Sequence, residues 1–220
     1  MTAPSRPARA RRRSAAPVVG GRLPQVTVAG DRIAPALTGG AYDVVAIALR
    51  PSSSTTDEGG PAGGWGTREV EELFGVVVAD EARLAEASGA VRDVVTVPVS
   101  AVSDDGEGVA CSRLLLVGVG DGSPLALRRA GAALARAVRG RDALLAAVAA
   151  DADDDGLRAF VEGLSLASYS FTRKSEQPRG AVGAVGLVLA RPEARAGAVA
   201  RAVTTATAVE RARDLANPPA

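Results

Sequence analysis

The sequence predicts an α/β domain in which helices cover both faces of a largely parallel or mixed β-sheet. From Leu23 onward, short β-branched or apolar runs alternate with longer segments of helical periodicity, which is the pattern that such a sheet requires. The chain has 220 residues, 47% of them hydrophobic and 23% charged, which is enough for one domain of ordinary size. No run approaches the roughly 18 apolar residues of a membrane-spanning helix, so we expect a soluble protein without membrane contacts. We expect a cytoplasmic location, and the single cysteine, Cys111, is compatible with a reducing cytoplasm.

The first half of the chain is expected to hold a buried strand, a long loop and three shorter elements. Tyr42–Leu49 is β-branched and nearly all apolar, which suits a strand covered on both faces, and Pro51 ends it. Residues 52–67 are polar and rich in glycine, so they predict a loop. We interpret Trp65 as an apolar anchor that packs this loop onto the body, rather than as an exposed contact residue for a partner. Beyond the loop, helices are expected over 68–74 and 80–88, and a strand over 91–99.

The clearest pair of elements is a buried strand over Arg113–Val119 and the helix that follows it. Ser123 is the expected N-cap of this helix, and Pro124 takes the first helical position, where its missing N–H is harmless. Gly140 is expected to end the helix. Residues 142–149 form either a strand or a buried helical segment, because their length favours the strand and their alanines favour the helix.

The C-terminal part predicts a helix, a strand and a second helix. The first helix runs from about Gly156 to Lys174, with Pro178 beyond its end, and Gly183–Ala190 is the strand. Pro192 opens the last helix, which ends at 217–219 and carries Val199, Val203, Ala206 and Val209 on one side. If that side packs on the domain's own sheet, the chain can be a stable monomer. If it normally meets another domain, it is exposed and promotes association.

Composition excludes several classes of active site. The chain has no histidine and one cysteine, Cys111, so it cannot form a Ser-His-Asp or Cys-His unit, an imidazole zinc site or an internal disulfide. Any metal would need oxygen ligands, and any proton shuttle would be a carboxylate, a tyrosine or Lys174, which is the only lysine.

The N-terminus is expected to be a disordered tail, since its first thirteen residues carry five arginines among Pro, Ala and Ser. The formal net charge of the chain is only +1, and no stacking aromatic residues accompany the arginines. DNA binding is therefore not expected unless this tail contributes to it.

The segment from Asp151 to Glu162 matches the spacing of a calcium-binding loop. The matching residues are Asp151, Asp153, Asp155, Gly156 and Glu162. However, Arg158 occupies a position that is normally aliphatic, and the chain has no second loop of this kind. We favour the interpretation that the aspartates lie at the N-terminus of a helix, whose partial positive charge stabilises them.

The glycine-rich stretch Gly118–Gly122 lies between the buried strand and the helix N-terminus. Backbone N–H groups in such a turn can receive an anion or a phosphate. The stretch lacks the lysine of a Walker motif and the spacing of the dinucleotide fingerprint. We favour a strand-to-helix turn that requires glycine, and the anion site remains the alternative.

Two motifs carry a resemblance to a known family. One is E-G-x-x-L-x-x-Y-x-F followed by basic residues, matched by Glu162, Gly163, Leu166, Tyr169, Phe171, Arg173 and Lys174. The other is A-R-D-L-x-N-x-P, matched by Ala212, Arg213, Asp214, Leu215, Asn217 and Pro219. With the R-L-L-L-V-G-V-G strand and the helix after it, they make residues 42–219 resemble the N-terminal half of the cytosolic leucyl aminopeptidase family. The similarity is more specific from Arg113 onward.

The resemblance implies a macro-domain-like N-terminal domain and a separate catalytic domain. In this family the catalytic domain holds two divalent metals, zinc or manganese, on Asp, Glu and Lys side chains. The family's metal-binding segments, including its N-T-D-A-E-G-R-L stretch, are not found before the chain stops at Ala220. We therefore assign no catalytic, cofactor-binding or metal-ligating residue, and we interpret Lys174 as a cation at a helix C-terminus.

These expectations give three segments and two functional hypotheses. Residues 1–22 are the arginine-rich tail, 23–191 the macro-like domain, and 192–220 the interdomain helix with the start of a linker. The leading hypothesis is the non-catalytic N-terminal domain of a truncated leucyl-aminopeptidase-like metallo-exopeptidase, inactive alone. Its partners would be its own catalytic domain, further copies in a hexamer and, for the parent enzyme, a peptide substrate. The alternative is a free-standing macro-like module that binds a nucleotide or ADP-ribose near Gly118–Gly122.

Overall fold

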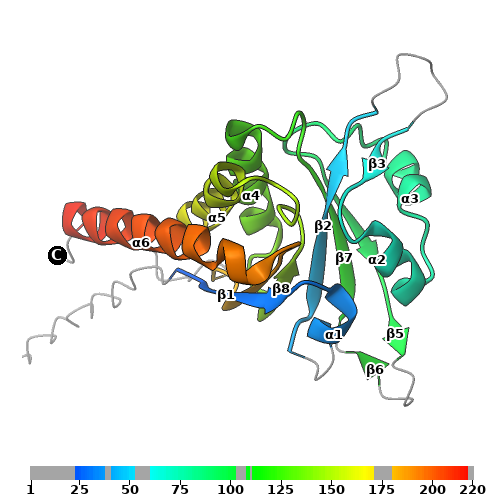
Figure 1. Cartoon of the computed structure of the whole chain (residues 1–220), viewed down its shortest axis with the longest axis horizontal. Coiled ribbons are helices and arrows are strands. Elements are labelled where there is room, and N and C mark those ends of the chain that lie inside the picture. The colour runs from blue at the N-terminus through cyan, green and yellow to red at the C-terminus, as the bar shows by residue number, and fades with distance from the viewer. Residues whose placement is uncertain are drawn as a thin grey trace, which may run out of the picture.

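A seven-stranded mixed sheet forms the centre of the computed structural model, and helices cover both of its faces (Figure 1). The structure describes residues 23–37, 41–52, 60–102, 108–109, 111–170 and 180–217. The strands of the sheet are β1 (Gln25–Gly30), β2 (Val44–Arg50), β3 (Ala62–Gly63), β4 (Val94–Pro98), β7 (Arg113–Gly118), β8 (Ala143–Ala146) and β9 (Ala184–Val188). The helices are α1 (Ile33–Leu37), α2 (Thr67–Phe74), α3 (Val78–Leu84), α4 (Pro124–Ala137), α5 (Asp154–Ser168) and α6 (Pro192–Ala216). The predicted α/β class is confirmed.

The strand order is β1-β9-β8-β2-β7-β4, with β3 paired to β2 beside this path. Strands β1, β9, β8, β2 and β7 run parallel, whereas β4 is antiparallel to β7 and β3 is antiparallel to β2. A separate short hairpin consists of β5 (Ala101–Val102) and β6 (Gly108–Val109). The sheet is therefore mixed, as predicted.

Strand β2 shows why its sequence is apolar at successive positions. Val44, Ala46 and Ala48 belong to the core under α4, α5 and α6. Val45, Ile47 and Leu49 belong to the second core, on the side of α1, α2 and α3. Because side chains alternate along a strand, a strand between two helical layers must be apolar on both faces. The prediction of a doubly covered strand here is confirmed.

Helices α4 and α5 pack closely against each other because each contributes a glycine at the contact. A Cβ atom at Gly131 of α4 would collide with the backbone carbonyl oxygen of Phe160. A Cβ atom at Gly163 of α5 would likewise collide with the carbonyl oxygen of Arg128. Gly163 belongs to the first of the two family motifs, so this motif position has a packing role.

The structure settles the open assignment of residues 142–149 and corrects two helix boundaries. Strand β8 covers Ala143–Ala146 and a turn follows, so the strand assignment is correct. Helix α3 begins at Val78, two residues before the predicted start, because Glu71 accepts a hydrogen bond from the Val78 N–H at 2.9 Å. It ends at Leu84, and the positive φ of Glu86 (51°) does not continue a helix.

The helix predicted to reach Lys174 ends at Ser168 instead. Tyr169 has φ −58° and ψ 131°, which is outside the helical region. Its side chain contacts α6 instead of continuing along α5, as described below. Lys174 and Pro178 lie outside the described residues.

The long helix α6 packs on the domain's own body. Val199 and Ala206 are buried in or near the core, and Val203 packs against it. In Figure 1, α6 lies beside α5 and runs past the end of the sheet toward the C-terminus. For Val199, Val203 and Ala206 the structure shows packing within the domain, whereas Val209 is only half-buried. In the part of the chain that the structure describes, no helix is long and apolar enough to cross a membrane.

Candidate functional site

A pocket of about 250 Å³ lies at the carboxyl ends of the parallel strands β2 and β7. Open α/β sheets commonly bind ligands at this edge. Its lining residues are Arg50, Val119, Gly120, Asp121, Gly122, Leu127, Val148, Asp151 and Ala152. The structure thus brings together two sequence candidates, the glycine-rich turn and the start of the aspartate-rich segment. The volume is below the roughly 300–1,000 Å³ of typical small-molecule sites.

The glycine-rich turn has a conformational reason for its glycines. Gly120 has φ 56° and Gly122 has φ 71°, both in the left-handed region that glycine adopts without strain. A Cβ atom at Gly118 would also collide with the backbone carbonyl of Ala90. Ser123 then caps α4, since its hydroxyl accepts a hydrogen bond from the Ala126 N–H, and Pro124 follows it. The predicted strand-to-helix turn is confirmed.

Most backbone amides of this turn are already paired within the protein. The pairs are Gly118 N–H to the Asp93 carbonyl at 2.8 Å, Val119 N–H to Leu49 at 3.0 Å, Gly120 N–H to Gly89 at 3.0 Å and Gly122 N–H to Val119 at 3.1 Å. The Ser123 N–H donates to the Asp121 carboxylate at 3.0 Å. A phosphate-binding loop needs free N–H groups that converge on the ligand. Because these N–H groups already have partners in the protein, the turn has few free N–H groups that could bind a phosphate.

The charges around the pocket do not favour an anion either. Asp121 accepts a second hydrogen bond from the Ser123 hydroxyl at 2.7 Å, and these bonds from Ser123 lower the pKa of its carboxyl group. The Arg50 guanidinium forms an ion pair with Asp151 at 2.5 Å. The pocket therefore presents two carboxylates and one guanidinium that already has a partner.

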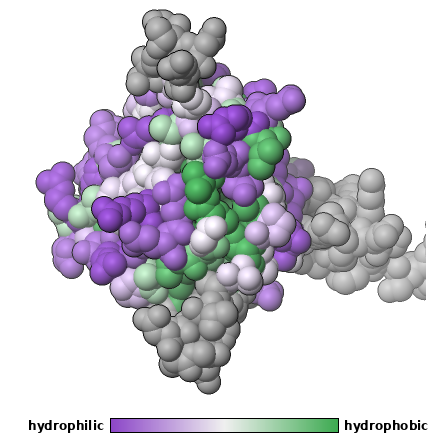
Figure 2. Space-filling view, turned by 90° about the vertical axis from the view of Figure 1, so that its right-hand side faces the viewer, coloured by the Kyte–Doolittle hydropathy of each residue, from purple (hydrophilic) through white to green (hydrophobic). Residues whose placement is uncertain are grey.

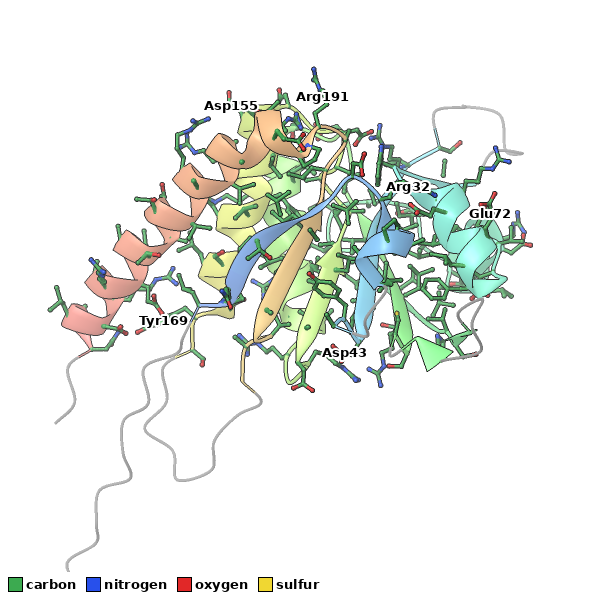
Figure 3. The ribbon with its side chains drawn as sticks, turned by 60° about the horizontal axis from the view of Figure 1, so that its bottom comes forward. Arg32, Asp43, Glu72, Asp155, Tyr169 and Arg191 are labelled. Carbon is green, nitrogen blue, oxygen red and sulfur yellow. The ribbon has the colours of Figure 1, made fainter. Side chains whose placement is uncertain are left out.

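The calcium-type pattern is divided among separate roles. Asp153 is the N-cap of α5 and accepts a hydrogen bond from the Gly156 N–H at 2.7 Å. Asp151 pairs with Arg50 in the pocket, and Asp155 lies in the first turn of α5, at the end opposite Tyr169 (Figure 3). No group of three or more His, Cys, Asp or Glu side chains among the described residues has an arrangement that could hold a metal ion. The arrangement is the one expected for aspartates at a helix N-terminus.

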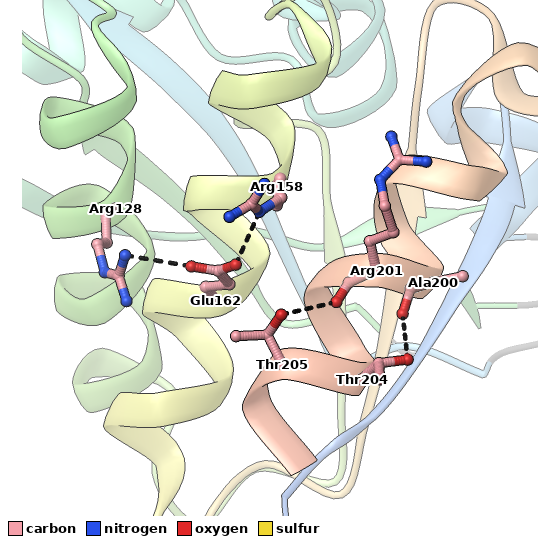
Figure 4. Close-up of polar contacts among 7 residues, drawn as sticks. All are labelled: Arg128, Arg158, Glu162, Ala200, Arg201, Thr204 and Thr205. Atoms are coloured by element: carbon pink, nitrogen blue, oxygen red, sulfur yellow. Dashed lines mark hydrogen bonds and ion pairs between the residues drawn. The ribbon is translucent and has the colours of Figure 1, made fainter. Parts of the chain in front are cut away.

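Glu162, the last residue of that pattern, is buried between two helices. Its side chain is 5% exposed and pairs with Arg128 of α4 at 3.1 Å and with Arg158 of α5 at 2.9 Å (Figure 4). Buried carboxylates are tolerated when they are paired in this way. Glu162 therefore joins α4 to α5, next to the close contact at Gly163.

The two family motifs meet in space, where the end of α5 contacts the end of α6. The Tyr169 hydroxyl donates to the Asp214 carboxylate at 2.9 Å, and the Arg213 guanidinium lies 5.3 Å from the centre of the Tyr169 ring. Arg213 also donates to the Leu166 carbonyl at 3.0 Å. Burial and the contact with Asp214 raise the pKa of Tyr169. The motif residues Phe171, Arg173, Lys174 and Pro219 lie outside the described residues.

Helix α6 is also fixed at its beginning. The buried Arg195 pairs with Asp154 of α5 at 3.2 Å and donates to the Ala152 carbonyl. On its outer side, Thr204 and Thr205 donate to the carbonyl oxygens of Ala200 and Arg201 in the same helix (Figure 4). Sequence reasoning missed the role of Arg195, because an arginine in a polar helix gives no signal that it is buried.

Trp65 and Cys111 have structural environments. Trp65 is partly buried and packs against the core on the α1–α3 side, so its interpretation as an anchor is confirmed. Cys111 is 2% exposed, and burial raises the pKa of its thiol, which keeps it protonated at neutral pH. Neither side chain lines the pocket at β2 and β7.

Comparisons with known proteins identify relatives of this fold. The family model described as "Cytosol aminopeptidase family, N-terminal domain" matches residues 66–177. The bottromycin maturation enzyme BotP in complex with Mn is 26% identical with a TM-score of 0.53, over 81% of this chain and 32% of that enzyme. A mutant of tomato leucine aminopeptidase, 17% identical, has a TM-score of 0.63 over 93% of this chain and 40% of its own. A search of curated proteins gave no match.

The chain thus spans about a third to two fifths of the length of these two enzymes. The tomato enzyme supports the fold alone, because its sequence identity is low. The family match covers just over half of the 220 residues and includes β4, β7, α4, β8 and α5. The chain therefore belongs to the cytosol aminopeptidase family, and residues 66–177 are part of its N-terminal domain.

Proposed function

We propose that this chain forms the N-terminal, non-catalytic domain of a leucyl-aminopeptidase-like metallo-exopeptidase. The parent enzyme would remove N-terminal amino acids from peptides, and this domain would have a structural and oligomerisation role. The observation that carries the proposal is the family match over residues 66–177. The contact between the two motif segments, at Tyr169, Arg213 and Asp214, supports a structural role for the motif residues.

The side chains of the described residues do not fit a two-metal aminopeptidase site. Two divalent ions would polarise the scissile carbonyl and activate the attacking water, and they need several converging carboxylates. Here the carboxylates of Asp151, Asp154 and Glu162 each pair with an arginine from another element. The proposal therefore assigns metal binding and catalysis to residues outside this domain.

The anchoring of α6 supports the structural role. Arg195 fixes the start of the helix to α5, and Arg213 and Asp214 fix its end to the other end of α5. Glu210 accepts a hydrogen bond from the Leu23 N–H at 3.1 Å, which adds a contact to the segment that leads into β1. A helix held at both ends would present a domain joined to it in a fixed orientation.

Hydrolysis of a leucine chromogenic amide in the presence of manganese or zinc tests the non-catalytic role. We expect the purified 220-residue chain to show no metal-dependent turnover. Robust turnover would contradict the assignment of catalysis to residues outside this domain. A known leucyl aminopeptidase assayed in parallel verifies the substrate and the metal conditions.

The DNA sequence downstream of the Ala220 codon tests whether this domain belongs to a longer parent enzyme. We expect the reading frame to continue into a segment with the Asp-, Glu- and Lys-containing motifs of the family. A stop codon at that position in the intact gene would contradict a parent enzyme in one polypeptide.

A further inference from the structure

Strand β4 (Val94–Pro98) lies at one end of the strand order and pairs only with β7 among the strands that the structure describes. Its outer edge therefore carries backbone groups without a strand partner. Such an edge is a template for pairing with another strand.

The hydrogen bonds to β7 identify the backbone groups that face outward. The Asp93 carbonyl accepts from the Gly118 N–H, and the Val99 N–H donates to the Ser112 carbonyl. In an antiparallel pair, alternate residues of a strand bond to the same neighbour. The residues between these two positions that face away from β7 are thus Val94, Thr96 and Pro98, and Pro98 has no N–H to donate.

The side chains of β4 give this edge little protection. Its sequence is V-V-T-V-P and contains no charged residue, although natural edge strands often carry lysine or an inward-pointing charge to prevent pairing. Thr96 is exposed, so a neighbouring strand can approach it. Pro98 limits the free edge at one end.

Apolar side chains lie on the same side of the molecule. Leu73, Phe74, Val76, Val95 and Val99 are only partly buried against the α1–α3 core, and Val77 is 54% exposed. Figure 2, which views the molecule from the side of α2 and α3, shows a hydrophobic strip bordered by hydrophilic residues. Apolar strips of this kind mark protein interaction sites.

We propose that the outer edge of β4 pairs with β4 of a second copy of this chain, antiparallel and across a two-fold axis. Centred on Thr96, the pairing lets each Thr96 N–H donate to the Thr96 carbonyl of the other copy, and each Val94 N–H to the other Pro98 carbonyl. Both outward N–H groups of the strand are then used, and the missing N–H of Pro98 costs no unpaired donor. The edge is therefore complementary to itself.

The symmetry also brings apolar side chains of the two copies together, because Val95 lies on β4 and Val99 follows it directly. A two-fold axis that relates antiparallel neighbours in one sheet is perpendicular to the sheet, so the α1–α3 layers of both copies stay on the same side. The apolar side chains of β4 on that side then lie next to those of the other copy, and an isologous interface results. The inference rests on the oligomerisation role in the proposed function and assigns its contact surface.

Two threonine variants test the pairing. Thr96→Lys places like charges opposite each other across the proposed axis, which destabilises cross-strand pairing. Thr27→Lys is the matched control, because Thr27 is exposed on β1, the strand at the opposite end of the sheet. Sedimentation velocity over a range of concentrations, with circular dichroism to verify folding, should show a reversible dimer for the wild type and Thr27→Lys. For Thr96→Lys the dissociation constant should rise at least about tenfold.

Hydrogen exchange of the unmodified chain gives a second readout that requires no variant. Protection of the Val94 and Thr96 amides should increase with protein concentration, and protection of the Thr27 amide should not. A wild type that stays monomeric, or an oligomer that Thr96→Lys leaves intact, would overturn the proposal. The chromogenic assay reports on catalysis only, so failure of either proposal is distinguishable from failure of the other.

Discussion

The two helical layers of the sheet differ in how they are stabilised. On one face, α4, α5 and α6 have 14, 15 and 25 residues, and α5 packs directly on both α4 and α6. On the other, α1, α2 and α3 have 5, 8 and 7 residues, and the exposed Val77 and Leu84 lie beside or within α3. The first layer includes α5 and α6, which carry described residues of both family motifs. Exposed large apolar side chains occur in both layers, because Leu125 of α4 and Leu215 of α6 are also exposed.

Truncation of one large side chain in each layer should give the largest difference in stability. Phe160 is fully buried in the α4–α6 core, so Phe160→Ala should lower the free energy of unfolding by about 4 kcal/mol. Leu84 of α3 is 81% exposed, so Leu84→Ala should change it by about 0.5 kcal/mol or less. Urea denaturation of both variants measures the comparison. Equal losses would show that the α1–α3 layer is as tightly packed as the other.

Disrupting the glycine contact between α4 and α5 should give the second-largest change in the free energy of unfolding. Gly163→Ala forces a methyl group against the Arg128 backbone and should cost about 3 kcal/mol of unfolding free energy. Gly197→Ala in α6 is the matched control, since a Cβ there meets only the flexible Arg201 side chain at 3.5 Å. The control should stabilise the chain by up to about 1 kcal/mol, through helix propensity. A neutral Gly163→Ala would mean that α4 and α5 separate easily.

The difference between the layers also explains which parts of the fold the sequence predicted. Helix α4 has its cap at Ser123, its proline at position 124 and a local apolar stripe, so its signals lie within the helix. Helix α1 was not predicted, because its N–H groups at Ile33 and Ala34 are capped by Glu69, 35 or more residues away. The early start of α3 likewise depends on Glu71. Caps that come from another element leave no local pattern in the sequence.

The pocket at β2 and β7 was likewise predictable only where its features depend on local sequence. The glycine-rich turn was predicted correctly, since its left-handed positions need glycine. The ion pair between Arg50 and Asp151 joins residues that are 101 positions apart, so no sequence pattern indicated it. The burial of Glu162 and Arg195 depends in the same way on which helices meet.

The contact between α5 and α6 should have a small effect that depends on pH. Tyr169→Phe removes the hydrogen bond to Asp214 and should lower the free energy of unfolding by about 0.5 kcal/mol near neutral pH. Because burial and Asp214 raise the pKa of Tyr169 in the folded state, this contribution is present below the ordinary tyrosine value of 10.0 and is lost as pH rises through the folded value. Thermal unfolding of both proteins from pH 7 to pH 11 measures the difference. A constant difference across this range would contradict the role of the hydroxyl.

The smallest expected effect concerns nucleotide binding at the pocket on β2 and β7. With most amides of its glycine-rich turn paired and two carboxylates in its lining, the pocket should not bind a nucleotide or ADP-ribose. A ligand at 100 times its dissociation constant would stabilise the fold by about 2.7 kcal/mol, a shift of several degrees that a thermal-shift assay detects easily. We expect no shift at millimolar ligand. A shift that Arg50→Ala abolishes and the control Arg129→Ala, an exposed arginine of α4, retains would instead assign a phosphate-binding role to this end of the sheet, on the side of the close-packed helices.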